Sequence, residues 1–290
     1  MPLTTIYGDG NGTRVIGDVS TGLFPQTLHP DVAAYVANQV ANGYSPTRTR
    51  VDALNNLVYM LISNGIYDKC QAIYPVLGGT TANAQKWNLK NSADTNAAFR
   101  LSFVGSWTYA DTGIKINSAV NTNYARTFYT PSTNATNNDI HLSVYIRNSY
   151  TGTGCPIGGC NGNQATSVAV QIFASTSLSG TTIQAQNTNQ ISNFGVSTAG
   201  MYMGNRSGST AQQAYYSGLL RASSSATSSS LASATAEITM ACRNNGALSM
   251  QFPTTSEIAF ASIGQSLTPE QARAFYIAVQ AYQTALSRQV

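Results

Sequence analysis

The chain has 290 residues, of which only 9% are charged, whereas about 25% is typical of soluble domains. Its net charge of +4 comes from 15 Lys and Arg residues spread over the whole length, and the lack of a basic cluster argues against nucleic-acid binding. No run of about 18 apolar residues occurs, and residues 1–22 lack the pattern of a secretion signal. We therefore expect no nucleic acid partner, no membrane span and no export by that route.

The missing charge is replaced by Ser, Thr, Asn, Gln and Gly. Few groups on such a surface titrate, and it offers hydroxyls and amides for contacts instead of ion pairs. This composition is typical of an extracellular or particle-borne protein more than of a cytosolic enzyme.

The first 65 residues predict two kinds of structure. Residues 1–28 contain five glycines and few spaced apolar residues, which indicates an extended docking arm, with simple disorder of a chain end as the alternative. From residue 29 apolar side chains recur at helical spacing, and Gly43 and Gly65 stand where helices end. We expect a small helical module over 29–65, with helices at 31–42 and 47–64.

Residues 66–264 predict a β-rich domain. From residue 98 short alternating runs recur about every ten residues between turn signals, and Ile140–Arg147 shows the cleanest period of two. No alternation of strands with helices supports a parallel sheet. The pattern predicts an antiparallel β-sandwich of jelly-roll type, with the serine-rich stretch 223–233 as a surface loop inside it.

A C-terminal helix is predicted over 268–288. Thr268 can cap its N-terminus, Pro269 takes the first helical position and Gln271 completes a capping box. Its apolar stripe should pack against the sandwich, with a neighbouring subunit as the alternative. The stripe consists of Phe275, Tyr276, Val279, Tyr282 and Leu286.

Catalytic chemistry has few candidate residues, because the chain holds eleven carboxylates and two histidines. No two carboxylates stand at alternate strand positions, as a retaining glycosidase on a sandwich would most easily place them. Glu237 and Glu257 could meet only across strands, and ordinary strand-edge charges explain them as well. His141 is expected to face solvent or a cross-strand partner. We therefore predict no catalytic residues, no cofactor and no metal site.

Binding chemistry has three weaker candidates. The aromatic side chains Trp107, Tyr109, Tyr124 and Tyr129 could form a platform for a glycan, although packing in the core or at an edge is the alternative. The segment 134–139 carries Asn and Asp oxygens that calcium could use, and a polar turn explains it equally well.

The third candidate is a pair of cysteines, Cys155 and Cys160, in the stretch 154–163, whose glycines predict a long loop. Two free thiols, a loop-closing disulfide and a metal site are the alternatives, and the metal lacks the further ligands it would need.

Two stretches resemble a known family. Residues 257–290 are similar to the ending of tailed-bacteriophage structural proteins with a concanavalin-A-like, laminin-G-like domain: EIAFASIGQSLTPEQARAFYIAVQAYQTALSRQV. Three short runs are similar to the entrance of the same domain: IYPVLGG at 73–79, KWNLK at 86–90 and AAFRL at 97–101. They frame residues 66–290, while the strands between them do not resemble one member closely.

The resemblance implies a non-enzymatic virion component with a concanavalin-A-like jelly roll, as a head decoration, head fibre or tail appendage. We would then expect assembly in the host cytoplasm, release by lysis, and contacts with other capsid or tail proteins through the N-terminal region. A homo-oligomer and a host surface glycan are further expected partners. The alternative is a polysaccharide-degrading glycoside hydrolase or lyase on the same fold.

Overall fold

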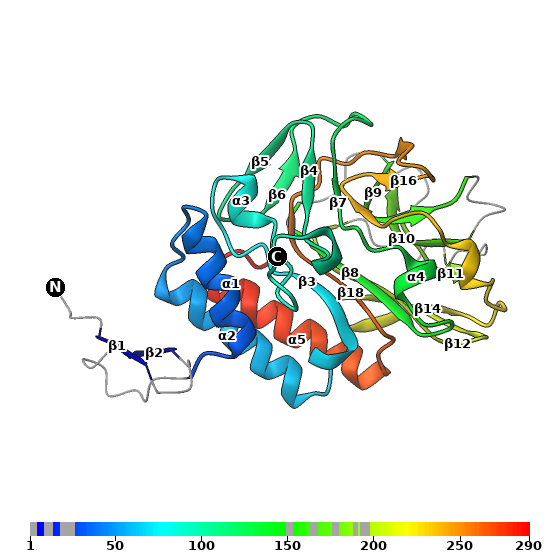
Figure 1. The fold of residues 1–290 in the computed structure, drawn as a ribbon. Helices are drawn as coiled ribbons and strands as arrows, with labels where there is room; N and C mark the ends of the chain where they lie inside the picture. Colours follow the sequence, from blue (N-terminus) through cyan, green and yellow to red (C-terminus); the bar gives the residue numbers. More distant parts are fainter. Residues whose placement is uncertain are drawn as a thin grey trace.

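The computed structural model describes residues 5–8, 14–17, 27–148, 153–162, 168–175, 180–187, 191 and 198–290. They form a β-sandwich with helices gathered on one side of it (Figure 1). The predicted antiparallel sandwich with N-terminal helices and a C-terminal helix is thus confirmed. The docking arm predicted for residues 1–28 lies outside the described residues for most of its length. Its described part includes a hairpin of β1 (Thr5–Gly8) and β2 (Arg14–Gly17).

The first sheet has the strand order β11-β10-β9-β15-β7-β4, with β16 and β17 attached beside β9. Its neighbouring strands are antiparallel, except for one parallel bridge between β16 and β9. The strands are β4 (Ser102–Val104), β7 (Tyr124–Arg126), β9 (Thr153–Cys160), β10 (Ala169–Ser175), β11 (Gly180–Asn187), β15 (Thr239–Met240), β16 (Arg243–Asn244) and β17 (Met250–Gln251).

The second sheet has the order β14-β13-β12-β8-β18-β6-β5, with β3 paired to β18. All of its described pairs are antiparallel. The strands are β3 (Cys70–Tyr74), β5 (Trp107–Tyr109), β6 (Ile114–Ile116), β8 (Ile140–Ile146), β12 (Gly200–Gly208), β13 (Ala211–Tyr216), β14 (Leu219–Ser224) and β18 (Ile258–Gly264).

The alternation of side chains along β8 shows that the main core lies between the two sheets. Ile140, Leu142 and Val144 point into the apolar layer between the sheets, which Ile157 and Ile172 of the first sheet complete. Because side chains alternate along a strand, the residues between them point to the opposite face of the second sheet.

Helices cover that opposite face (Figure 1). They are α1 (Pro30–Ala41), α2 (Arg48–Ser63) and α5 (Pro269–Ala285), close to the predicted bounds. Short helical turns occur at η1 (Tyr67–Lys69), α3 (Ala82–Gln85), η2 (Asn96–Ala98), α4 (Pro131–Asn134) and η3 (Leu231–Ser233). No helix among the described residues has the length and apolar character that crossing a membrane needs.

The C-terminal helix belongs to the sandwich domain. The capping box of Thr268 and Gln271 is formed, and Phe275 is fully buried against Phe260 of β18 at a ring-centroid distance of 5.8 Å. The residues of α1 and α2 join the same apolar cluster, including Leu57. The helical module predicted over 29–65 therefore shares its core with α5 and the second sheet.

The end of the chain is anchored by Arg288, which is only 1% exposed. Its guanidinium donates to the carbonyl oxygens of Val76 at 2.6 Å, Pro75 at 3.0 Å and Ala259 at 3.2 Å. Gln283 accepts a further hydrogen bond from its Nε at 2.6 Å. These contacts connect the C-terminus to the segment that follows β3 and to β18.

Candidate functional site

The four aromatic residues predicted as a glycan platform do not come together on the surface. Trp107 and Tyr109 turn inward against Phe103, at ring-centroid distances of 5.0 and 5.1 Å. Tyr129 is fully buried, and its hydroxyl donates to Gln71. Tyr124 lies half-exposed on the outer face of the first sheet, whereas Tyr109, equally half-exposed, packs against the core from the second sheet. Core and edge packing, the alternative reading, therefore describes the other three.

The glycine-rich stretch that holds Cys155 and Cys160 is a strand, β9, and not a loop. Five residues along a strand separate Cα atoms by roughly 16 Å, at about 3.3 Å per residue. A disulfide needs Cα atoms within about 7 Å, so the strand geometry keeps these two apart, and all four cysteines are buried free thiols. Burial raises the pKa of the Cys242 thiol to about 12, which keeps it protonated at neutral pH.

The oxygen-rich segment 134–139 directs its side-chain oxygens at backbone donors. Asn134 accepts from Thr130 N at 2.9 Å, and Asp139 accepts from the backbone and hydroxyl of Ser266, both at 2.7 Å. Among the residues that the structure describes, no group of three or more acidic, His or Cys side chains is arranged for a metal ion. The geometry matches the polar-turn alternative.

His141 does not face solvent but a cross-strand partner, Ser262 of β18, the second of the two predicted orientations. It lies beneath α5, where Phe275 packs against its ring at 5.8 Å. Its Nδ1 donates to the carbonyl of Gln265, and its Nε2 lies 2.9 Å from Ser262 Oγ, which in turn lies 2.8 Å from Ser143 Oγ. All three side chains are fully buried, so this histidine and serine pair serves packing and has no access to a substrate. Burial lowers the pKa of His141 to about 4.

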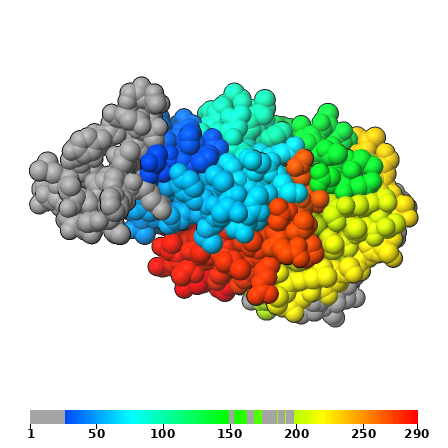
Figure 2. All heavy atoms as spheres, turned by 90° about the horizontal axis from the view of Figure 1, so that it is seen from below, coloured from blue at the N-terminus to red at the C-terminus, as the bar shows by residue number. Residues whose placement is uncertain are grey.

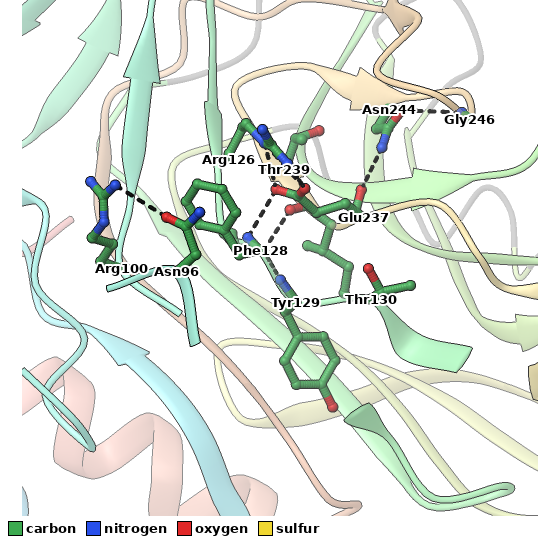
Figure 3. A network of polar contacts seen from close by, with 12 residues as sticks. Asn96, Arg100, Arg126, Phe128, Tyr129, Thr130, Glu237, Thr239, Asn244 and Gly246 are labelled. Carbon is green, nitrogen blue, oxygen red and sulfur yellow. Dashed lines mark hydrogen bonds and ion pairs between the residues drawn. The ribbon is translucent and has the colours of Figure 1, made fainter. Parts of the chain in front are cut away.

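The outer face of the first sheet carries a different set of side chains. Alternation along β7 turns Ala125 into the core and leaves Tyr124 and Arg126 half-exposed on the outside. Directly after this strand, Phe128 takes a left-handed backbone conformation with φ of 59°. That conformation is unfavourable for a residue with a side chain, and it places a half-exposed ring beside Arg126 (Figure 3).

Glu237 holds this arrangement in place. Its carboxylate accepts hydrogen bonds from Arg126 Nη2 at 2.7 Å and Nε at 3.1 Å, and from the backbone N–H of Phe128 at 2.8 Å. Because the Glu237 side chain is only 10% exposed and the Arg126 side chain 32% exposed, the ion pair is poorly screened. The hydrogen bonds to Glu237 raise the pKa of Arg126 above its usual value.

A second arginine, Arg100, approaches the Phe128 ring from the segment that follows η2. The guanidinium carbons of Arg126 and Arg100 lie 4.4 and 5.6 Å from the Phe128 ring centroid. Arg100 donates to Asn96 Oδ1 at 3.1 Å and pairs with Asp94 at 3.4 Å. Figure 3 shows the Phe128 ring between the Asn96–Arg100 pair and Arg126.

We call this surface the Phe128 face, and it consists of Asn96, Arg100, Tyr124, Arg126 and Phe128. It combines two half-exposed rings with two oriented guanidinium groups and an exposed amide. Glu237 binds two of the three guanidinium nitrogens of Arg126, and within the described residues Nη1 has no recorded partner. The face can therefore offer apolar ring surface and fixed donors to the same ligand.

Sequence reasoning found Tyr124 but missed the other members of this face. An ordinary strand-edge charge is one of the two predictions for Glu237, whereas the structure shows it as the nearly buried partner of Arg126. One signal was available: in a chain with so few charges, a Glu directly before the apolar run from Ile238 needs a cation nearby. Nothing in the sequence indicates the left-handed backbone of Phe128.

No family model and no curated protein matches the sequence. Domain 4 of AbnA, a GH43 extracellular arabinanase from Geobacillus stearothermophilus in complex with arabinotriose, is 14% identical over 71% of this chain and 98% of that chain, with a TM-score of 0.45. Trypanosoma rangeli sialidase in complex with 2,3-difluoro-KDN is 9% identical over 78% of this chain and 39% of its own, with a TM-score of 0.48.

A third similar structure is that of botulinum neurotoxin type C, described for its interaction with two ganglioside molecules. It is 12% identical over 75% of this chain and 53% of that chain, with a TM-score of 0.46. The chain thus spans less than two thirds of the sialidase and toxin chains. At such low identity the likeness concerns the fold and transfers no activity.

These comparisons contradict two predictions from the sequence. The structures named are glycosidases and a toxin, and none of them is a virion protein, so the prediction of a phage virion structural protein is wrong by this comparison. The same comparison contradicts the prediction of a non-enzymatic protein, because the arabinanase and the sialidases are enzymes, although the likeness in fold assigns no activity to this chain. A surface poor in charge and rich in hydroxyls suits many proteins that work outside the cytoplasm, so composition could not separate these classes. The family resemblance of residues 257–290 is not tested and stays a prediction.

Proposed function

We propose that this chain binds carbohydrate at the Phe128 face. The observation that carries the proposal is the half-exposed Phe128 ring beside Arg126, whose guanidinium is oriented by Glu237 at 2.7 Å. A sugar presents apolar C–H surface and hydroxyls side by side, and binding sites for such ligands combine ring surface with a few placed polar groups. The Phe128 face has both, within one patch of sheet.

Rigidity supports the same proposal. Arg126 is held by two hydrogen bonds to a nearly buried carboxylate, and Phe128 is held by its own backbone bond to that carboxylate. Groups fixed before binding lose less conformational entropy when a ligand arrives. A weakly binding, hydroxyl-rich ligand benefits most from such a surface.

Binding to an array of neutral and acidic glycans, followed by calorimetry on the best ligand, tests the proposal. Phe128→Gly removes the ring at a backbone conformation that glycine prefers. The matched control is Phe252→Gly, since Phe252 also has a positive φ of 54° and an arginine, Arg243, 4.6 Å from its ring centroid. We expect Phe128→Gly to weaken binding at least about tenfold and the control to bind as the wild type does.

Two results would reject the proposal: no glycan bound by the folded wild type, or equal affinity for wild type and Phe128→Gly. The same samples should be assayed for new reducing ends, because hydrolysis is the alternative from the sequence. Turnover by the wild type that Glu237→Gln abolishes would assign hydrolysis to this face instead of binding alone.

A further inference from the structure

A groove runs along the molecular surface between α2 and α5, on the side away from the sandwich. The two helices lie side by side, as Figure 2 shows in light blue and red. Gln271 near the start of α5 donates to the carbonyl oxygens of Asn64 at 3.3 Å and Gly65 at 3.0 Å, beyond the end of α2. The groove between them has a volume of about 600 Å³.

The walls of the groove are uncharged. None of the eleven residues that line it is Asp, Glu, Lys or Arg. On α5 the wall consists mostly of small side chains, Ala278, Ala281 and Ala285, which leave the groove wide. A water-filled apolar groove of this size is unfavourable unless something covers it.

The same surface carries protruding apolar side chains. Tyr59 and Ile62 on the α2 rim are 41% and 42% exposed, and Ile277, one turn before Ala281 on α5, is 48% exposed. The Tyr59 side chain is fixed by a hydrogen bond from its hydroxyl to the carbonyl oxygen of Thr27 at 3.1 Å. One face therefore contains both a hollow lined by small residues and side chains of a size to fill such a hollow.

We propose that this face binds a second copy of the chain, in a two-fold symmetric contact of the α2–α5 pairs. In a two-fold contact each copy presents the same patch, so a patch must be complementary to itself. The apolar rim side chains and the alanine-lined hollow meet that requirement. The uncharged walls add no repulsion between like charges, which a charged patch would suffer when facing its own copy.

The size of the face sets the strength of the contact. The 16 residues of α2 span about 24 Å at 1.5 Å per residue. Two helices side by side are roughly 20 Å wide, so each copy can bury at most about 500 Å² if the contact extends over the whole length of α2, beyond the groove lining. About 1,000 Å² in total lies at the lower limit for specific interfaces. We therefore expect a dimer that dissociates on dilution.

Sedimentation velocity of the full chain, from about 1 μM to about 1 mM, tests this contact. Wild type should shift from monomer to dimer across the range. Ala281→Arg places a charge at the groove, and Ile277→Asp places one on the rim, so each should raise the dissociation constant at least about tenfold. Both positions are exposed in the monomer, and unchanged thermal melting at low concentration verifies that the variants fold.

The matched control is Val120→Asp, which also places a charge at an exposed apolar residue, 44% exposed, outside the groove. It should dimerise as the wild type does. A wild type that stays monomeric over the whole range overturns the proposal and leaves the groove to a different occupant, such as an amphipathic helix of another protein. Variants that dimerise like the wild type overturn it equally. Neither result bears on the Phe128 face, which lies on the other sheet.

Discussion

The outer faces of the two sheets carry side chains of different character, and only one of these faces is covered by helices. In the second sheet the outward positions are occupied by apolar side chains such as Tyr145, Met203 and Phe260, and helices cover them. In the first sheet the outward positions near β7 are occupied by Tyr124 and Arg126, which remain half-exposed. Alternation gives both sheets an apolar inner face, so the outer residues decide which face folds against helices and which stays available to a ligand.

The strongest test of this comparison removes the ring that joins α5 to the second sheet. Phe275 is fully buried between Phe260 and His141, so Phe275→Ala should cost about 3–5 kcal/mol of unfolding free energy. Urea unfolding measures the change. Ile277→Ala, at an exposed position of the same helix, should change stability by less than about 0.5 kcal/mol when measured as a monomer. Equal losses in both variants would mean that α5 is not held by this ring.

Lowering the pH should destabilise the covered face, because its buried His141 stays neutral while the same residue takes up a proton in the unfolded chain. The pKa of His141 is about 4 in the folded protein because burial disfavours the imidazolium, whereas it is about 6.5 in an unfolded chain. Between these values the unfolded chain binds more protons, so stability present at neutral pH declines as the pH falls from about 6.5 to about 4. The complete loss amounts to about 3 kcal/mol.

Urea unfolding at about pH 7 and about pH 4.5 checks that slope, with His141→Gln as the comparison. The variant should be less stable at neutral pH because its side chain fits the site poorly, but it should lose less stability on acidification. If the unfolding free energy of wild type and of His141→Gln falls equally between the two pH values, groups other than His141 cause the acid sensitivity.

On the open face, the ion pair between Arg126 and Glu237 should contribute a smaller amount. Glu237→Gln keeps the size of the side chain but replaces a charged acceptor of three hydrogen bonds, so we expect a loss of about 1.5–3 kcal/mol. A double-mutant cycle with Arg126→Gln isolates the pair. Glu257→Gln, which alters an ion pair with Arg147 whose carboxylate is more exposed, 20% against 10% for Glu237, should cost about 1 kcal/mol or less. A coupling energy near zero for the Arg126 pair would contradict its role in fixing the face.

The smallest effect is expected for stability in Phe128→Gly. Glycine relieves the left-handed strain at this position by roughly 1 kcal/mol, and the half-exposed ring contributes a similar amount of packing. We therefore expect a net change within about 1 kcal/mol, by thermal melting. A large loss would show that the ring is part of the core and would weaken its assignment to ligand binding.

Much of the fold could be predicted from sequence, because alternation and capping are local signals. Ile140–Ile146 forms a strand and Thr268 begins a helix with its capping box formed, both as predicted. The glycines of 154–163 predict a loop, and this prediction is wrong, because Thr153–Cys160 is a central strand. A Cβ on Gly158 would approach Cβ of Gln171 to 2.4 Å. Glycine is therefore needed at this position because the neighbouring strand lies too close for a side chain, and not because the backbone must be flexible.

The candidate site was harder to predict, because its members meet only in three dimensions. Arg126 and Glu237 are 111 residues apart in the chain. The two arginines at Phe128 come from different strands and turns, and the positive φ of Phe128 leaves no mark in a sequence. The predicted platform failed for the opposite reason: alternation turned Trp107 and Tyr109 inward together.

The anchoring of Arg288 has a consequence for the order in which the protein folds. Its guanidinium bonds to Pro75, 213 residues earlier, and β3 pairs with β18, where Ile73 lies opposite Ser262. β3 therefore cannot pair until β18 has been made, and such distant pairing folds slowly. The apolar face that α5 covers in the folded protein stays exposed to solvent until that late pairing and the docking of α5 are complete.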